Sequence, residues 1–221
     1  VRGLVALAKR VLAKGVESKF ERLREIIESE HFSGEKILIF TEHRDTLEYL
    51  TNRLSALGFA GRLAHIHGGM DYRERQEAIE HFRKPAAEHG AQYMICTDAA
   101  AEGVNLQFCW IMINYDIPWN PARLEQRMGR IHRYGQKHDP VFLLNMVATS
   151  TREGRVLKTL LDKLERIRKQ LHSDKVFDSI GRVFSDVSIK TYMERALTAA
   201  ENNTLEDLTE ELDGKITAEQ L

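Results

Sequence analysis

The residues with the clearest chemistry in this chain are arginines that recur between positions 123 and 133. At roughly 100° per residue on a helix, four arginines fall within about a third of the circumference, opposite an apolar stripe. They are Arg123, Arg127, Arg130 and Arg133, and the stripe is Leu124, Met128 and Ile131. Like charges one turn apart repel each other unless a negative group faces them, and guanidinium suits bidentate contacts with phosphate. The spacing therefore predicts a phosphate-rich ligand, and the alternative is a solvated basic face.

The elements that must position these residues follow a strand and helix alternation. Short apolar segments bounded by turn residues predict strands near 36–41, 62–67, 92–97, 109–115 and 141–147. Helical patterns separate most of these segments, which predicts an α/β fold with an open parallel sheet and helices on both faces. Polar residues follow the strands' carboxyl ends, where such sheets bind ligands: Thr41, His67-Gly68, Thr97-Asp98 and Asp116.

Two helix starts are predicted from capping-box patterns. Asp45 and Asp71 each precede a glutamate by three residues. Apolar residues at helical spacing predict the buried sides. These are Leu47, Leu50, Leu54 and Leu57 in the first helix, Ala78, Ile79 and Phe82 in the second, and Phe20, Leu23, Ile26 and Ile27 in a helix from Ser18.

Composition narrows the class of protein but does not identify its ligand. The net charge of −1 over 221 residues gives no overall attraction to nucleic acid, so such binding must come from local patches. Cys96 and Cys109 lie in apolar runs without zinc spacing, which indicates buried free thiols. No apolar run reaches transmembrane length and no signal peptide opens the chain, which begins at Val1 without a methionine, so we expect an intracellular piece of a longer protein without membrane contact.

The chain divides into three expected parts. Residues 1–17 form a basic amphipathic pattern typical of a linker helix from an upstream domain. Residues 18–150 carry the strand and helix alternation. Residues 151–221 begin with a capping signal for a long helix and end in an acidic stretch, which predicts helical N- and C-terminal extensions around one α/β domain.

The segment from Gln126 to Gln136 resembles motif VI of the superfamily 2 helicases, in the form found in Swi/Snf-like DNA translocases. Residues 95–107 resemble motif V, residues 114–121 the segment between V and VI, residues 37–43 motif IV, and residues 67–75 the motif that follows it. Together they imply the second RecA-like lobe of such an enzyme over residues 18–150. Ala100-Ala101-Glu102 stands where eukaryotic remodellers have Gly-Gly-x, which places the resemblance nearest to a bacterial branch that includes an RNA-polymerase-recycling ATPase.

The resemblance implies ATP chemistry that this sequence carries only in part. Phosphoryl transfer needs a glycine-rich loop with lysine and acidic residues for Mg²⁺, and no such loop occurs in the sequence. ATP and Mg²⁺ are therefore expected to bind mainly to an N-terminal RecA-like lobe of the same protein. By resemblance, Arg130 and Arg133 are catalytic arginines, and Gln126, Gly103, Glu102 and Arg127 lie near the nucleotide. An alternative for Arg127 is a structural pair with a carboxylate on the same lobe.

The resemblance also implies contacts with a nucleic-acid backbone, for which double-stranded DNA is the expected partner. The matching positions are Thr41, Gly68 and Thr97, with Arg73 and Arg75 as further phosphate contacts. For the threonines the alternative is capping of a strand-to-helix turn, and for the two arginines it is a solvated face. A protein partner such as a polymerase or a defence complex, and a cytoplasmic, nucleoid-associated location in a prokaryote, are further expectations.

Other site chemistries are weakly supported by the sequence. His65 and His67 share one strand face, but no third ligand completes a metal site, so we expect no metal. Asp98 and Glu102 lack an accompanying nucleophile. The rival to a motor lobe is a degenerate RecA-like module that binds nucleic acid or protein without a role in hydrolysis. A free-standing nucleic-acid adaptor would be expected to have a strongly basic surface.

Overall fold

A computed structural model describes residues 18–98, 105–118, 121–131 and 140–148, together with Thr151, Gly154, Arg155 and Lys158. The expected linker helix 1–17 and the acidic tail lie outside the described residues. The expected helix that starts near residue 150 is described only at the four single positions.

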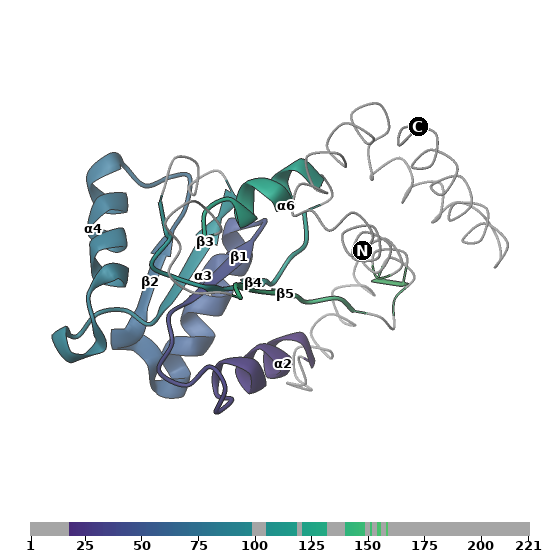
Figure 1. The fold of residues 1–221 in the computed structure, drawn as a ribbon, viewed down its shortest axis with the longest axis horizontal. Coiled ribbons are helices and arrows are strands. Elements are labelled where there is room, and N and C mark those ends of the chain that lie inside the picture. Colours follow the sequence, from purple (N-terminus) through teal and green to yellow (C-terminus); the bar gives the residue numbers. More distant parts are fainter. Residues whose placement is uncertain are drawn as a thin grey trace, which may run out of the picture.

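Five parallel strands form the sheet, and they are the five that the sequence predicts. They are β1 (Ile37–Thr41), β2 (Leu63–Ile66), β3 (Tyr93–Thr97), β4 (Ile111–Asn114) and β5 (Phe142–Asn145). Their order across the sheet is β2-β3-β1-β4-β5, with β1 at the centre (Figure 1). All five residues of β1 and β3 are buried, which explains why these strands read as continuous apolar runs in place of alternating ones.

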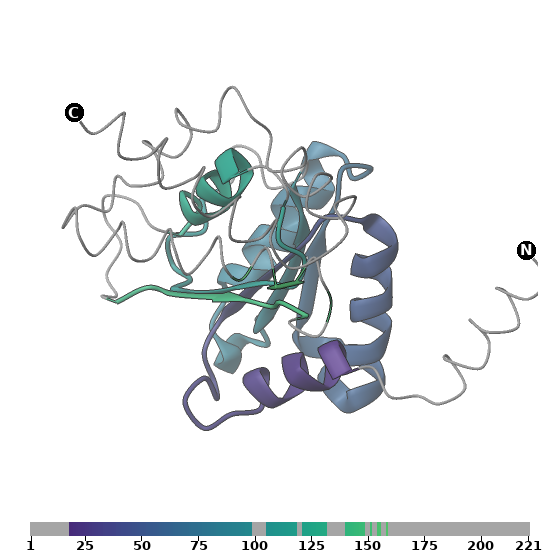
Figure 2. The same cartoon turned by 90° about the vertical axis from the view of Figure 1, so that its right-hand side faces the viewer.

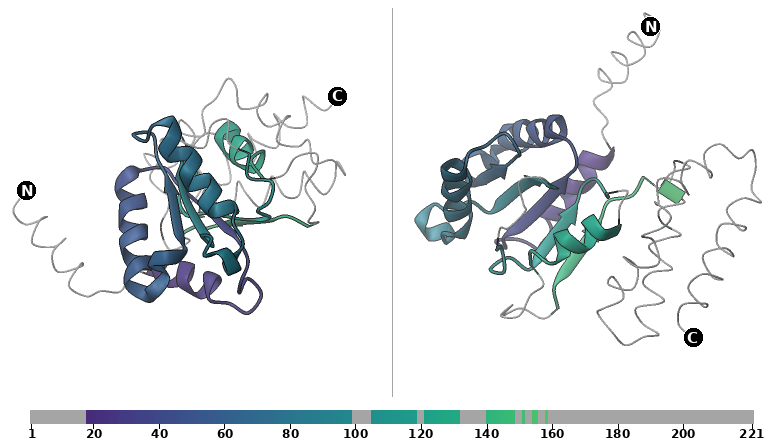
Figure 3. Two further views of the ribbon diagram at one scale, coloured as in Figure 1. Left: turned by 90° about the vertical axis from the view of Figure 1, so that its left-hand side faces the viewer. Right: turned by 90° about the horizontal axis from the view of Figure 1, so that it is seen from above.

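Helices cover both faces of the sheet, as predicted. They are α2 (Ser18–Ile27), α3 (Arg44–Leu54), α4 (Tyr72–Arg83) and α6 (Pro121–Met128). One face is covered by α2 and α3 (Figure 2). There they pack against Ile37, Ile39 and neighbouring strand residues, and the Phe20 and Tyr49 rings meet edge to face at 6.0 Å. The other face is covered by α4 (Figure 3). There α4 packs against Leu38 and Phe40. The alternate residues of β1 therefore serve two separate apolar cores.

One of the two predicted helix starts is correct and the other is wrong. Asp71 is the N-cap of α4, and both hydrogen bonds of the capping box with Glu74 are present. The predicted cap at Asp45 is wrong, because α3 begins two residues earlier, with His43 as its N-cap, and the His43 side chain makes no capping bond.

The predicted burial of Leu57 is also wrong. The helix α3 ends at Leu54, and a π-type turn, η1 (Ser55–Phe59), follows it with Gly58 at a φ of 93°. Because the regular helix has ended before Leu57, the helical period no longer applies there, and Leu57 stays 42% exposed. The other leucines of that stripe, Leu47, Leu50 and Leu54, are buried.

Two short 3-10 turns complete the connections. They are η2 (Ala60–Arg62), which leads into β2, and η3 (Ala86–Glu88), which precedes β3. No helix in the described part of the chain is long and apolar enough to cross a membrane.

Candidate functional site

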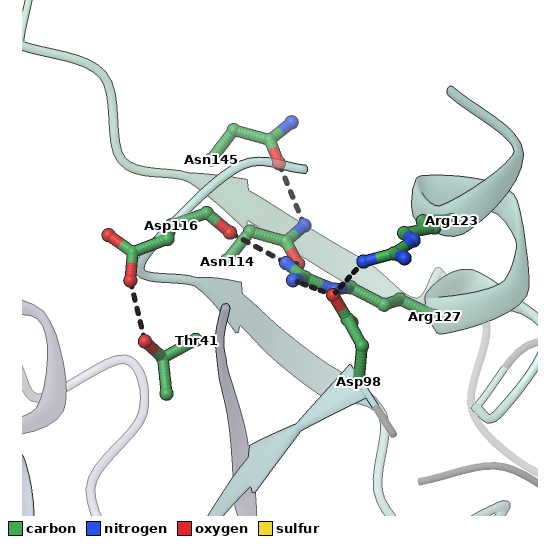
Figure 4. A network of polar contacts seen from close by, with 7 residues as sticks. All are labelled: Thr41, Asp98, Asn114, Asp116, Arg123, Arg127 and Asn145. Carbon is green, nitrogen blue, oxygen red and sulfur yellow. Dashed lines mark hydrogen bonds and ion pairs between the residues drawn. The ribbon is translucent and has the colours of Figure 1, made fainter. Parts of the chain in front are cut away.

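Polar side chains gather at the carboxyl edge of the parallel sheet, as Figure 4 shows. Thr41 ends β1, Asp98 directly follows β3, Asn114 ends β4 and Asn145 ends β5. The register pairs Asn114 with Asn145 across two neighbouring strands, and the Asn114 amide donates a hydrogen bond to the Asn145 side-chain oxygen at 2.8 Å. The strand ends thus bring to one edge residues that lie up to about a hundred positions apart in the sequence.

Arg127 of α6 is the centre of this edge. Its Nε and Nη2 donate to the two carboxylate oxygens of Asp98 at 2.5 and 2.8 Å, which makes a bidentate ion pair. Its Nη1 donates to the Asn114 side-chain oxygen at 2.9 Å and to the Asp116 backbone carbonyl at 2.6 Å. The guanidinium also lies 5.0 Å from the centroid of the Phe40 ring. Arg127 therefore ties α6 to the ends of β3 and β4.

Arg127 is buried, although the helical spacing placed it on the basic face with the other arginines. Only 2% of its side chain is exposed, and Leu124 and Ile131 beside it are 4% and 1% exposed. On a helix Arg127 lies about 60° from Leu124, at the border between the two predicted stripes, and Asp98 draws it to the buried side. Of its two predicted roles, this geometry favours the structural pair with a carboxylate of the same lobe over a nucleotide contact.

The predicted helical face also ends earlier than expected. The helix α6 stops at Met128, and residues 129–131 form a turn, so Arg123 and Arg130 do not share one continuous helix. In that turn the Arg130 amide donates to the Arg127 carbonyl at 3.0 Å, and the Arg130 carbonyl accepts from the Leu106 amide at 3.2 Å. The Arg130 backbone is thus held directly beside the arginine that anchors α6.

The remaining residues expected near the nucleotide have mixed placements. Gln126 is exposed on α6, and the Arg130 side chain is half-buried. Glu102, Gly103 and Arg133 lie outside the described residues, so their roles stay predictions.

Asp116 forms a second polar cluster at the same edge. Its carboxylate accepts a hydrogen bond from the Thr41 hydroxyl at 2.5 Å and an ion-paired one from Lys19 of α2 at 2.9 Å. Burial alone would raise the pKa of the Asp116 carboxyl, but the Thr41 and Lys19 contacts, with a backbone bond from Glu42, lower that pKa on balance. Asp116 is therefore a stably ionised anchor between α2, β1 and the end of β4.

Thr41 and Thr97, expected to contact nucleic acid, have little exposed surface. Thr41 is 0% exposed and Thr97 is 7% exposed. Because the Thr41 hydroxyl already donates to Asp116, its side chain serves the fold in this conformation, and a direct phosphate contact is not favoured. Gly68, in contrast, is exposed in the turn after β2.

The arginines after Gly68 differ from each other. Arg75 donates from Nε to the Met70 carbonyl at 3.0 Å and from Nη2 to the Gly68 carbonyl at 3.2 Å, so it braces the glycine turn. The Arg73 side chain is 88% exposed and pairs with Glu77 one turn along α4, as a solvated-face arginine does.

Sequence reasoning missed three members of the polar edge. Lys19, Asn114 and Asn145 were assigned no role, although Asn114 and Asn145 both lie within two residues of the carboxyl ends of predicted strands, which is the signal that could have found them. Lys19 precedes its partner Asp116 by 97 residues, and no local pattern connects the two.

The histidines and cysteines form no metal cluster in the described part of the chain, where no three His, Cys, Asp or Glu side chains are grouped suitably. The rings of His65 and His67 are stacked with centroids 6.0 Å apart. Both cysteines are free and buried. Burial raises the pKa of both thiols, that of Cys109 to about 12, so neither is a reactive thiolate.

Two bacterial relatives match part of this chain. The chain is 43% identical over 135 residues to the uncharacterized ATP-dependent helicase YqhH of Bacillus subtilis, a match that covers 61% of this chain and 23% of that protein. It is 38% identical over 108 residues to the RNA polymerase-associated protein RapA of Serratia proteamaculans, covering 48% of this chain and 10% of that one. The chain thus spans a quarter or less of the length of these two relatives.

A solved structure supports the fold. The C-terminal part of the Fun30 ATPase domain superposes with a TM-score of 0.56 at 24% identity, covering 63% of this chain and 44% of that one. The model of the helicase conserved C-terminal domain matches residues 18–135, which is more than half of the chain and includes every strand except β5. The chain therefore belongs to the helicase conserved C-terminal domain family, with a RecA-like α/β lobe and relatives among the Swi/Snf-like superfamily 2 helicases.

Proposed function

We propose that this chain is the second motor lobe of an ATP-dependent nucleic-acid translocase, and that Arg130 and Arg133 are its arginine fingers. The observation that carries the proposal is the attachment of α6 to the sheet edge. Arg127 binds Asp98 and Asn114 from a buried position, and the turn that presents Arg130 begins immediately after it. A finger must be held where charge develops in the transition state, and a fixed helix end provides that support.

The lobe acts on ATP only together with an N-terminal lobe. The sequence has no phosphate-binding glycine loop with lysine, and the described residues include no grouped acidic ligands for Mg²⁺. In this proposal the N-terminal lobe provides these, and ATP with Mg²⁺ binds between the lobes. Gln126 is exposed on α6, which leaves it available for the proposed nucleotide contact. We expect the purified chain alone to release no phosphate from ATP above background, with or without duplex DNA.

Double-stranded DNA is the proposed track, held through its phosphate backbone. The exposed turn at Gly68, braced by Arg75, is the best placed of the expected contact positions. Thr41 contributes by holding the end of β1 through its hydrogen bond to Asp116, and Thr97 is nearly buried at the end of β3. A protein partner of the polymerase type fits the similarity to a relative whose name states association with RNA polymerase.

The test uses the full-length protein with Arg130→Ala and Arg133→Ala. An arginine finger is worth about 10³ to 10⁵ in turnover, so DNA-stimulated ATP hydrolysis should be abolished. Affinity for ATP should fall by no more than about tenfold, because the N-terminal lobe makes most ground-state phosphate contacts. Lysine at either position should not restore turnover, since a point charge lacks the planar fork.

Arg22→Ala is the matched control. This arginine is 68% exposed on α2 and pairs only with Glu25 in the described structure, so its loss should leave turnover unchanged. If Arg130→Ala and Arg133→Ala both keep turnover within a few-fold of the parent, a degenerate RecA-like module without a role in hydrolysis becomes the better description.

A further inference from the structure

Asp98 interacts with two arginines of α6, Arg123 and Arg127, and the two interactions differ in strength (Figure 4). Both of its oxygens accept short hydrogen bonds from Arg127, at 2.5 and 2.8 Å. Arg123 approaches the same carboxylate only to 3.9 Å, which is beyond hydrogen-bond distance. The Arg123 side chain is 52% exposed, whereas that of Arg127 is 2% exposed. Arg127 therefore fixes α6 to the sheet edge, whereas Arg123 is exposed and makes only a long ion pair with Asp98.

Among the described side chains that contact one another at this edge, positive charges outnumber negative ones. The carboxylate of Asp116 contacts Lys19 and Thr41. Asp98 and Asp116 then face Lys19, Arg123 and Arg127, which is one positive charge in excess among these side chains. A single loose ion pair at an exposed site is weakly held, because water and salt screen it. A bound anion can therefore replace Asp98 as the ion-pair partner of Arg123, while Arg127 keeps its hydrogen bonds to Asp98.

We propose that Arg123 is a phosphate-binding residue of this lobe, kept over the edge by Asp98 and transferred to a phosphate oxygen of the bound ligand. The proposal rests on the proposed function and deepens it, since it assigns a ligand contact on α6 ahead of Arg130. The guanidinium carries a positive charge and hydrogen-bond donors that suit a phosphate oxygen. The phosphate belongs either to the nucleotide or to the nucleic-acid backbone.

The experiment compares full-length protein carrying Arg123→Gln with the parent and with the control Arg22→Ala. Binding is measured for ATP, through a fluorescent ribose-labelled analogue, and for a duplex DNA over a range of salt concentrations. If the phosphate comes from DNA, DNA affinity should fall about tenfold and the slope of log affinity against log salt should become shallower by about 0.9, with ATP affinity unchanged. If it comes from the nucleotide, ATP affinity should fall about tenfold while the salt slope stays as in the parent.

Two further results separate a ligand contact from a structural one. Arg123→Lys should restore most of the lost affinity, because an exposed phosphate contact depends mainly on the charge, and the melting temperature of Arg123→Gln should equal that of the parent. Unchanged affinities and salt slope in Arg123→Gln would overturn the proposal, as would equal losses for both ligands together with a lower melting temperature. Failure of the finger test at Arg130 and Arg133 with a clear effect at Arg123 would overturn only the catalytic assignment.

Discussion

Replacing Arg127 should destabilise the protein more than replacing any exposed arginine of the described structure. In Arg127→Met, two hydrogen bonds to Asp98, one to Asn114 and one to the Asp116 carbonyl are lost together. The Asp98 side chain is only 18% exposed, so its charge would be left poorly solvated. Removing one partner of a buried ion pair costs about 3–5 kcal/mol, and we expect a loss in that range.

Urea unfolding followed by circular dichroism measures this loss. With a denaturant dependence of about 2 kcal/mol per molar urea, the midpoint should fall by about 1.5 to 2.5 M. The matched control is Arg73→Ala. Arg73 is 88% exposed and, among the described residues, pairs only with Glu77 along α4, so its loss should cost no more than about 0.5 kcal/mol. Arg127→Lys should recover less than half of the stability, because a lysine cannot bind both Asp98 oxygens and Asn114 at once.

A double-mutant cycle identifies the cause. If the cost comes from an uncompensated carboxylate, Asp98→Asn in the Arg127→Met background should add little further destabilisation, and the two single effects should be far from additive. A loss below about 1 kcal/mol for Arg127→Met, or additive effects of the two substitutions, would refute the view that the Arg127–Asp98 pair attaches α6 to the sheet.

Three further predictions concern stability. Asp71→Ala should cost about 1 kcal/mol in urea unfolding by removing the cap bond to the Glu74 amide, whereas Asp71→Asn should cost much less. Contacts in the folded protein lower the pKa of the Asp116 carboxyl below its usual 3.8. The stability that the ionised Asp116 contributes is therefore fully present above 3.8 and is lost as the pH falls through the lower folded pKa. The stability difference between parent and Asp116→Asn should thus be constant near neutral pH and shrink in acid; a constant difference throughout would contradict the assigned ion pair. Gly90→Ala should cost about 2 kcal/mol or more, because the new Cβ would lie 1.9 Å from the Lys84 carbonyl oxygen, and a smaller melting shift than Gly61→Ala would argue against that contact.

The features that the sequence predicted correctly depend on local information. Each strand is an apolar run of four or five residues, and its position follows from its own composition. The capping box at Asp71 is local in the same sense, because its two hydrogen bonds join residues three positions apart. The predicted box at Asp45 failed because the same pattern also fits a first-turn acidic residue, and α3 places Asp45 there.

The order of the strands could not be predicted, because it depends on contacts between distant segments. β3 lies between β2 and β1, so the strand that is third in the chain separates the first two. Nothing in the composition of β3 distinguishes this place from an edge of the sheet. The contacts at the polar edge could not be predicted for the same reason. Lys19 reaches Asp116 because α2 packs against the same apolar core as β1 and β4.

Arg127 illustrates why a residue's role at this edge needed the structure. Its position on the helix lies at the border between the basic and apolar stripes, so periodicity alone allows either side. What decides is a carboxylate 29 residues earlier, at the end of β3, together with an asparagine at the end of β4. Removing an arginine from water is costly unless its donors are satisfied, and here four of them are. Arg123 lies four residues earlier on α6, where it comes only within 3.9 Å of the Asp98 carboxylate, and it stays exposed. The same carboxylate thus fixes one arginine in the fold and leaves the other available to a phosphate.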